Sequence, residues 1–345
     1  MEKVELNKIY LGDTLEVLKS WPDEFVDCIV TSPPYFGLRD YGVEGQIGLE
    51  KTFDEYLKKM LLITNELKRV LKKTGTLWWN HGDSYGTGSG AGVREGKQAT
   101  NRGTQTNEGW QKEGKASVPG YEKSLLFQNY RLIIRMIDEQ KWILRNTIIW
   151  HKPNCMPSSV KDRFTVDFEP VFFFTKSKKY YFETQYEPYQ GPINRWGGNY
   201  FNLRVPNAKK AKSSQYIASE KEQQQYAIAA RSRNMRPDER GRNMRSIWKI
   251  PTKPYASAHF ATFPPALIEV PIKAGCPKNG IVLDPFMGSG TTAEVACYLG
   301  RNYIGIELNP EYIKLAEKRL KQNILNLTIS PPIPQKTPSK PSKVP

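Results

Sequence analysis

Short apolar segments alternate with amphipathic helical segments along two parts of this chain of 345 residues. The clearest predicted helix has apolar side chains at helical spacing from Phe53 to Leu71, with Gly75 as its stop. Seven apolar segments are predicted to be strands: 9–11, 26–30, 76–80, 142–150, 170–175, 280–283 and 303–306. Strands that alternate with helices predict an α/β fold with a doubly wound, mostly parallel, seven-stranded sheet.

The polar and glycine-rich motifs of the chain follow the predicted strands directly. They are Asp13, Ser32–Tyr35, Asn80–Asp83, Asp284–Thr292 and Glu307. In open parallel sheets, ligands bind in the crevice beyond the carboxyl ends of the strands. We therefore expect one crevice at this edge of the sheet to collect all of these motifs.

The charge of the chain is strongly positive and unevenly distributed. Its 51 Lys and Arg against 35 Asp and Glu give a net charge of +16. Residues 176–253 hold seventeen Lys and Arg against six acids, so +11 of this excess lies in one stretch that lacks sustained apolar periodicity. A localised basic excess indicates a polyanionic partner, most simply nucleic acid, although a solvated basic face is the alternative.

Several classes of protein are excluded or disfavoured by composition. No window approaches the roughly 18 uninterrupted apolar residues of a membrane span, and Met1 leads into charged sequence that lacks a signal core, which favours a cytoplasmic protein. The four cysteines are far apart and the three histidines form no tight cluster, so neither disulfides nor a metal site are expected.

The loop from Asp284 to Thr292 follows an apolar strand and precedes a helix, which is the usual place for a cofactor loop. Gly288 and Gly290 allow the backbone to approach a ligand closely. The loop has Gly290 where a P-loop has Lys, and Ala293 where a dinucleotide fold has its third glycine, so phosphate binding is disfavoured. Glu307, at the end of the next strand, has a carboxylate that suits ribose hydroxyls.

The Ser-Pro-Pro-Tyr turn at residues 32–35 ends a predicted buried strand. Two consecutive prolines constrain the backbone and remove two N–H donors, which leaves carbonyl groups facing outward. The Ser32 hydroxyl and the Pro33 carbonyl can then accept hydrogen bonds from one amino group, and Tyr35 offers a flat face to a heterocycle. By itself this motif is more typical of a structural turn, but its place at the predicted crevice indicates a substrate site.

These motifs resemble those of the DNA amino-methyltransferases that use S-adenosyl-L-methionine and methylate cytosine N4 or adenine N6. The resemblance is carried by Thr31–Tyr35 and by Asp284–Thr292 with Glu307. Their order, with the catalytic turn first, then a basic region, then the cofactor loop, is similar to the beta group, whose Rossmann-like methyltransferase fold is circularly permuted. Shorter matches lie at 12–13, 75–80, 150–154 and 259–264. The resemblance covers about residues 5–180 and 247–320.

The resemblance implies roles for individual residues. Ser32, Pro33, Pro34 and Tyr35 would form a catalytic turn that holds the amine of a flipped base, without a covalent adduct. The residues implied to bind S-adenosyl-L-methionine are Asp13, Thr31, Phe263, Asp284, Pro285, Phe286, Gly288, Ser289, Gly290, Thr291 and Glu307. Asp13 would lie near the adenine amine of the cofactor, or it would serve as the N-cap of the helix that begins near Leu15.

The target base and the class of activity leave alternatives. In this family Ser-Pro-Pro-Tyr occurs more often with cytosine N4 methylation and Asp-Pro-Pro-Tyr with adenine N6, so cytosine N4 is favoured and adenine N6 is the alternative. A non-catalytic DNA-binding protein that retains the fold is a second alternative, which the intact Ser32, Tyr35, Gly288 and Glu307 disfavour. Methylation of a protein glutamine, whose turn usually reads Asn-Pro-Pro-Tyr, is disfavoured by Ser32 and by the basic insertion.

The resemblance also implies a prokaryotic or viral origin, a domain organisation and partners. Residues 1–180 would form the catalytic half with a mobile glycine-rich loop at 86–120, 181–250 the target-recognition region, 251–327 the cofactor-binding half of the same domain, and 328–345 a disordered tail rich in Pro and Lys. The expected partner is double-stranded DNA, with a separate cognate restriction endonuclease if the enzyme serves a restriction-modification system, and the chain would be a monomer or homodimer. The candidate DNA contacts are Lys209, Lys210, Lys212, Arg231, Arg233, Arg236, Arg240, Arg242 and Arg245.

Overall fold

The computed structural model describes residues 4–38, 42–86, 118, 120–188, 240–252 and 263–329, with the side chains of 323–329 left out. The chain divides into two compact units, Thr184–Arg245 and the remainder. Most of the predicted loop at 86–120, the tail beyond residue 329 and six of the predicted DNA contacts (Lys209, Lys210, Lys212, Arg231, Arg233 and Arg236) lie outside the described residues. Within these residues, no helix is long and apolar enough to cross a membrane.

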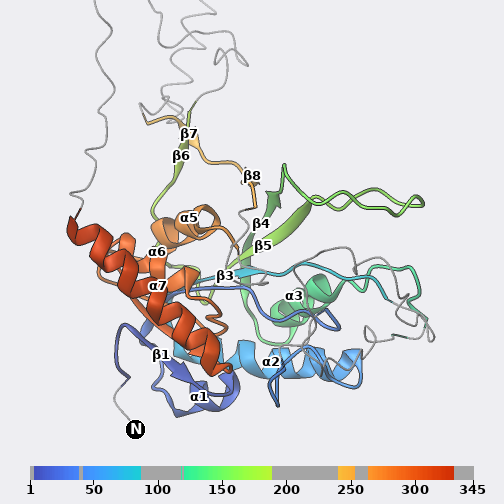
Figure 1. Cartoon of the computed structure of the whole chain (residues 1–345), viewed down its shortest axis with the longest axis horizontal. Helices are drawn as coiled ribbons and strands as arrows, with labels where there is room; N and C mark the ends of the chain where they lie inside the picture. The colour runs from blue at the N-terminus through green and yellow to red at the C-terminus, as the bar shows by residue number, and fades with distance from the viewer. Residues whose placement is uncertain are drawn as a thin grey trace, which may run out of the picture. The chain divides into compact units, whose positions relative to one another are not determined.

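The larger unit is built on one mixed sheet (Figure 1). Its strand order is β1-β10-β9-β2-β3-β5-β4-β8, and only the two pairings of β5 are antiparallel. The strands are β1 (Lys8–Leu11), β2 (Val26–Thr31), β3 (Leu71–Asn80), β4 (Ile143–His151), β5 (Phe168–Thr175), β8 (Ile247–Lys249), β9 (Ile281–Asp284) and β10 (Asn302–Glu307). The mostly parallel α/β prediction is confirmed.

The prediction of seven strands is wrong by one, because the described part of the chain forms an eight-stranded sheet. The additional strand is β8, which pairs in parallel with the end of β4 from Ile149 to His151. It is three residues long and lies at the sheet edge, and such a short segment has no periodicity that a sequence reading can detect.

Helices cover both faces of the sheet (Figure 1). The helices α1 (Thr14–Ser20), α2 (Phe53–Val70) and α3 (Gln128–Asp138) form one layer, and α5 (Pro265–Gly275), α6 (Thr291–Tyr298) and α7 (Pro310–Ile329) form the other. Because both faces are covered, the central strands carry apolar side chains on both sides, such as Trp78 and Trp79 of β3. Helix α7 extends to Ile329, two residues into the predicted tail.

The predicted end of the long helix is also wrong. Helix α2 ends at Val70, and Leu71, Lys72, Lys73 and Thr74 already belong to β3, so that Gly75 lies inside a strand. Val26 of β2 pairs with Leu71, but the next paired residue, Cys28, lies opposite Thr76. The additional residues of β3 form a bulge, which the sequence pattern did not indicate.

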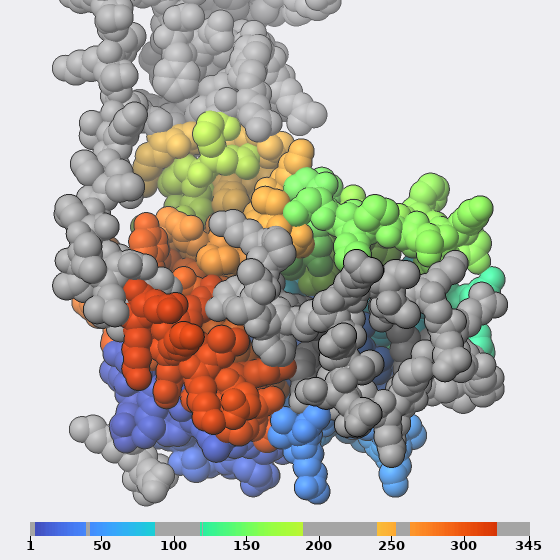
Figure 2. Space-filling model, in the orientation of Figure 1, coloured from blue at the N-terminus to red at the C-terminus, as the bar shows by residue number. Residues whose placement is uncertain are grey.

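The first and last strands of the sheet are neighbours in space. Leu11 of β1 lies opposite Glu307 of β10 in a parallel pair, and α7 contacts β1. Figure 2 shows the surfaces of the N-terminal segment in blue and of α7 in red adjoining each other. This arrangement is what a circularly permuted sheet requires, because segments from the two ends of the chain complete one edge together.

The smaller unit, Thr184–Arg245, contains a short antiparallel pair among its described residues. Strand β6 (Tyr186–Glu187) pairs with β7 (Arg242–Asn243). The Arg240 guanidinium lies 4.2 Å from the centroid of the Tyr186 ring, and Arg242 and Arg245 both form ion pairs with Glu187. Three of the predicted DNA contacts therefore belong to one small cluster around this strand pair.

Candidate active site

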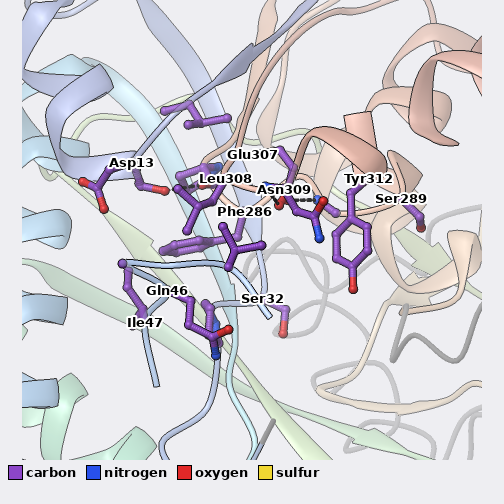
Figure 3. A pocket seen from close by; sticks show the side chains of 17 residues that line it. Asp13, Ser32, Gln46, Ile47, Phe286, Ser289, Glu307, Leu308, Asn309 and Tyr312 are labelled. Carbon is purple, nitrogen blue, oxygen red and sulfur yellow. Dashed lines mark hydrogen bonds between the residues drawn. The ribbon is translucent and has the colours of Figure 1, made fainter. Parts of the chain in front are cut away.

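A cavity opens at the carboxyl ends of the parallel strands, between β10, β1 and the turn after β2 (Figure 3). Its volume is about 890 Å³ when the open space at its mouth is included. The lining residues come from five segments within 13–14, 32–34, 43–47, 285–289 and 306–312. The tertiary structure therefore brings together the predicted cofactor loop, Glu307, Asp13 and Ser32.

The Glu307 carboxylate is held at the end of β10 by two backbone N–H groups. Gly288 donates to its Oε2 at 2.8 Å and Asn309 donates to its Oε1 at 2.8 Å. Burial raises the pKa of Glu307, while these N–H donors act in the opposite direction. Each oxygen keeps a lone pair that can accept a further hydrogen bond, so the carboxylate can bind two ligand hydroxyls without losing its backbone donors.

Asp13 combines the two roles that the sequence left open. Its Oδ1 accepts from the backbone N–H groups of Leu15 at 2.9 Å and of Glu16 at 3.2 Å, so it is the N-cap of α1. Its Oδ2 accepts no hydrogen bond from any described residue, and the side chain lines the cavity. One oxygen orients the carboxylate, and the other is available to a ligand.

The glycine loop positions its backbone by packing against helix α7. Gly290 has φ of +82° and is the N-cap of α6, and a Cβ at this position would lie 2.8 Å from the Cβ of Ala316. A side chain here would therefore push α7 away from the loop. Next to it, the Ser289 hydroxyl is buried and has no hydrogen-bond partner among the described residues, although Ser289 lines the cavity.

Asp284 lies behind the cavity wall, where it holds the loop in place. Its carboxylate accepts from Thr31 at 2.7 Å, from Thr292 at 2.6 Å and from the Phe286 N–H at 3.0 Å. Burial raises the pKa of Asp284 to about 6, and the two threonine hydroxyls act in the opposite direction. The carboxylate therefore ties β9 to its neighbour β2 and to the start of α6.

This buried carboxyl predicts a pH-dependent stability. Because its pKa of about 6 in the folded protein lies above the ordinary 3.8, the folded state binds the proton more tightly than the unfolded state. Its contribution to the free energy of unfolding is largest below about pH 4 and is lost as the pH rises through 6. Between pH 4 and 7, the stability of the wild type relative to Asp284→Asn should fall by about 2 kcal/mol. Denaturant unfolding of both proteins at the two pH values measures this change, and a constant difference would contradict it.

The predicted cofactor residues divide into two groups. Those that line the cavity are Asp13, Pro285, Phe286, Gly288, Ser289 and Glu307. Thr31, Phe263, Asp284, Gly290 and Thr291 are not among the lining residues; Thr291, for example, accepts from Arg319 of α7 at 2.9 Å. The motifs did not point to Asn309 and Tyr312, although both closely follow Glu307, and Gln46 and Ile47 carry no sequence signal for this site.

The turn after β2 is supported by a buried chain of hydrogen bonds. The Tyr56 hydroxyl donates to the Pro34 carbonyl at 2.9 Å and lies 3.2 Å from Nε2 of His81, and Trp79 Nε1 donates to His81 Nδ1 at 3.3 Å. Because the hydroxyl has one proton, Nε2 of His81 must be the donor to it. Burial lowers the pKa of His81 to about 3, which agrees with this neutral tautomer.

These hydrogen bonds hold the carbonyl of Pro34. They leave the Ser32 hydroxyl and the Pro33 carbonyl of the same turn able to accept hydrogen bonds. No described residue donates to the Pro33 carbonyl, and the Ser32 hydroxyl lies 3.4 Å from the Tyr35 hydroxyl. The Tyr35 ring lies beside His81 with centroids 5.1 Å apart, and its hydroxyl donates to Glu169 at 3.2 Å. Ser32 and Pro34 line the cavity, and Pro33 and Tyr35 do not.

Two buried cysteines near the sheet do not have the properties of nucleophiles. Burial raises the pKa of Cys276 to about 12, and it also raises the pKa of Cys28. Both side chains are fully buried. A reaction that proceeds through a thiolate is therefore not supported by either residue.

Comparisons with known proteins give matches along most of the chain. A family model described as DNA methylase matches residues 26–318. The type II methyltransferase M.Cfr9I of Citrobacter freundii is 38% identical over 332 residues, which are 94% of this chain and 92% of that protein. M.SmaI of Serratia marcescens is 37% identical over 319 residues, 91% of this chain and 90% of its own length.

Solved structures share the fold. The PvuII DNA methyltransferase, described as cytosine-N4-specific, superimposes with a TM-score of 0.53 at 21% identity and covers 94% of this chain and 93% of its own. A putative DNA modification methylase from Thermus thermophilus, complexed with S-adenosyl-L-methionine, has a TM-score of 0.54 at 22% identity. The match covers 92% of this chain and 94% of that protein. On the evidence of the family model and of the type II relatives, this chain belongs to the DNA methylase family of N6 and N4 methyltransferases.

Proposed function

We propose that this protein transfers a methyl group from S-adenosyl-L-methionine to the exocyclic amine of a base flipped out of double-stranded DNA, with cytosine N4 as the target. The observation that carries the proposal is one cavity that has Glu307, Asp13 and Gly288 on one side and Ser32 on the other. A cofactor site and a catalytic turn that share a cavity place a donor and an acceptor side by side, as group transfer requires.

The residues that line the cavity fit S-adenosyl-L-methionine. The Glu307 carboxylate would accept from the ribose hydroxyls, and Oδ2 of Asp13 would accept from the adenine amine. The Ser289 hydroxyl, buried beside the glycine loop without a partner among the described residues, would find one in a polar group of the ligand. The cofactor, when bound, supplies a methyl group on a sulfonium that is its own leaving group.

The turn would act on the base by position rather than by covalent chemistry. The Ser32 hydroxyl and the Pro33 carbonyl would accept the two N–H groups of the target amine, which favours a pyramidal nitrogen whose lone pair can attack the methyl group. Alignment of two reacting groups contributes about 7–11 kcal/mol in favourable cases. Flipping the base costs a few kcal/mol, which stacking on the Tyr35 ring would partly offset.

Cytosine N4 is supported by two observations. The turn begins with Ser32, as is more common among cytosine N4 enzymes, and the fold is shared with a solved methyltransferase described as cytosine-N4-specific. DNA methylated by the purified protein should be digested to nucleosides and identified by mass spectrometry. We expect N4-methylcytosine; N6-methyladenine would establish the alternative base, and no modified nucleoside would contradict the proposal.

We further propose that residues 181–250 recognise the DNA target, and that 1–180 and 251–327 are the two halves of one catalytic domain. The positive net charge of residues 176–253 supports the assignment of DNA recognition to 181–250. The compact unit Thr184–Arg245 lies within 181–250. The matches to type II methyltransferases support a separate restriction endonuclease as a partner.

Simultaneous replacement of Lys209, Lys210 and Lys212 by alanine should weaken DNA binding and its dependence on salt. Each phosphate contact contributes a slope of about −0.9 in log K against log salt, so the loss of three should reduce the slope by roughly 2.7. The methylated sequence should not change, because phosphate contacts carry no base information. Binding titrations at several salt concentrations measure the slope, with Lys58→Ala on α2 as the control. An unaltered slope would remove these lysines from the DNA interface.

A further inference from the structure

Glu169 is a charged residue beside the catalytic turn that no sequence motif pointed to. It lies near the start of β5, opposite Trp150 of β4, and its side chain is 22% exposed. Its Oε1 accepts from the Lys152 ammonium, which is 19% exposed, and its Oε2 accepts from the Tyr35 hydroxyl at 3.2 Å and from the Asn80 amide at 3.4 Å. The carboxylate is thus held by three donors from three different elements.

The close packing around Tyr35 and Glu169 depends on Gly82. A Cβ at this position would lie 2.8 Å from Cε2 of Tyr35 and 3.3 Å from the Glu169 carboxyl carbon. No side chain fits between the backbone and these two groups without a shift. The contact between the tyrosine hydroxyl and the carboxylate is therefore part of the packed structure of the site.

The charge of Glu169 determines the direction of the hydrogen bonds that reach Ser32. An ionised carboxylate can only accept, so the single proton of the Tyr35 hydroxyl must point to Glu169. In the contact of 3.4 Å between the hydroxyls of Ser32 and Tyr35, Ser32 must then be the donor. With its only proton directed to Tyr35, the Ser32 oxygen presents lone pairs elsewhere.

We propose that Glu169 is a positioning residue which, through Tyr35, orients the Ser32 hydroxyl as a hydrogen-bond acceptor for the target amine. An amine that is about to attack needs acceptors for its N–H groups, and a hydroxyl whose proton faced it would repel those groups. The Lys152 ammonium keeps the carboxylate in place and, by occupying Oε1, leaves Oε2 to Tyr35. This inference rests on the proposed function and adds a residue to its catalytic arrangement.

Replacement of Glu169 by glutamine tests the direction of the hydrogen bonds from Ser32 through Tyr35 to residue 169. The Lys152 ammonium will hold the amide oxygen, so the amide NH₂ must face the Tyr35 hydroxyl. Tyr35 would then accept, its proton would point to Ser32, and the Ser32 proton would point to the target amine. We expect kcat to fall on the order of 100-fold, comparable to the loss of one transition-state hydrogen bond, with cofactor Kd and DNA affinity within about threefold.

The double variant Lys152→Met with Glu169→Gln distinguishes orientation from a merely structural role. Without the ammonium, the amide can turn and present its oxygen to Tyr35 and Asn80. This restores the direction of the hydrogen bonds from Ser32 through Tyr35. We expect the double variant to be about tenfold faster than Glu169→Gln alone. A purely structural role predicts that removing a second partner from this network lowers activity further, and that result would overturn the proposal.

Tyr35→Phe provides an independent test, since it keeps the aromatic ring and removes the hydroxyl that connects Glu169 to Ser32. Glu169→Gln should add little to the loss in kcat that Tyr35→Phe causes, because both act through the same hydroxyl. Full additivity would overturn the proposal, as would wild-type kcat in either single variant. If Glu169→Gln does not fold, as judged by thermal melting, the kcat of Tyr35→Phe tests the proposal, and a wild-type kcat in that variant overturns it. Glu5→Gln, in an exposed pair with Lys8 at the amino end of β1, is the matched control.

The two hypotheses fail in different ways. A wild-type protein that methylates no DNA contradicts the proposed function. A wild-type protein that methylates DNA, together with a Glu169→Gln variant of equal kcat, contradicts only the role of Glu169.

Discussion

Replacement of Ser32 by alanine is expected to lower kcat for DNA methylation by on the order of 100-fold or more, which is about 2.7 kcal/mol of transition-state stabilisation. The hydroxyl directly follows β2, where it lies 3.4 Å from the Tyr35 hydroxyl, and Ser32 lines the cavity. Alanine removes the acceptor but preserves the turn, because Tyr56 still donates to the Pro34 carbonyl. The affinity for S-adenosyl-L-methionine should remain within a few fold.

Single-turnover kinetics and a cofactor titration measure the two quantities separately. Ser20→Ala is the matched control, because its hydroxyl donates to the Val17 carbonyl of the same helix at 2.7 Å. If Ser32→Ala lost cofactor binding while its turnover stayed at the wild-type rate, Ser32 would belong to the cofactor site and the assignment of the turn to the base would be wrong.

Replacement of Glu307 by alanine is expected to weaken the binding of S-adenosyl-L-methionine by about 10–100-fold. Two ribose hydroxyls would lose a charged acceptor, and hydrogen bonds to charged groups contribute about 1.5–3 kcal/mol. The loss includes a second effect, because the carboxylate also accepts from the backbone N–H groups of Gly288 and Asn309. The recognised DNA sequence should not change.

Isothermal titration calorimetry of the cofactor measures this loss directly. The exposed Glu311, paired with Lys314 on α7, provides the control substitution Glu311→Ala. Wild-type affinity in Glu307→Ala would refute the cofactor assignment of this cavity.

The sequence predicted that its motifs would meet at one cavity, but it did not distinguish which of their residues would line that cavity. It placed Asp284 and Thr31 in the cofactor site, but the structure shows that they bond to each other at 2.7 Å behind the lining of the cavity. A motif indicates which residues a site needs, without distinguishing those that touch a ligand from those that hold the loop. In the described residues, Ser32 and Glu307 line the cavity, as their positions at strand ends indicated.

Other features had no sequence signal at all. The edge strand β8 is only three residues long, and the bulge in β3 follows from pairing between strands rather than from local propensity. The six candidate DNA contacts at 209–236 all lie outside the described residues, so their role stays a prediction.

The sequence by itself determined the α/β class, the mostly parallel sheet and the two motifs at strand ends, because these depend on local periodicity and on turn chemistry within about ten residues. Only the tertiary structure decided which distant groups meet. β1 lies beside β10, so Asp13 and Glu307 share a cavity, although 294 positions separate them. Likewise, Glu169 reaches Tyr35 across 134 positions. Such contacts depend on the order of strands in the sheet, which arises from packing between segments distant in the sequence and which no short stretch of sequence encodes.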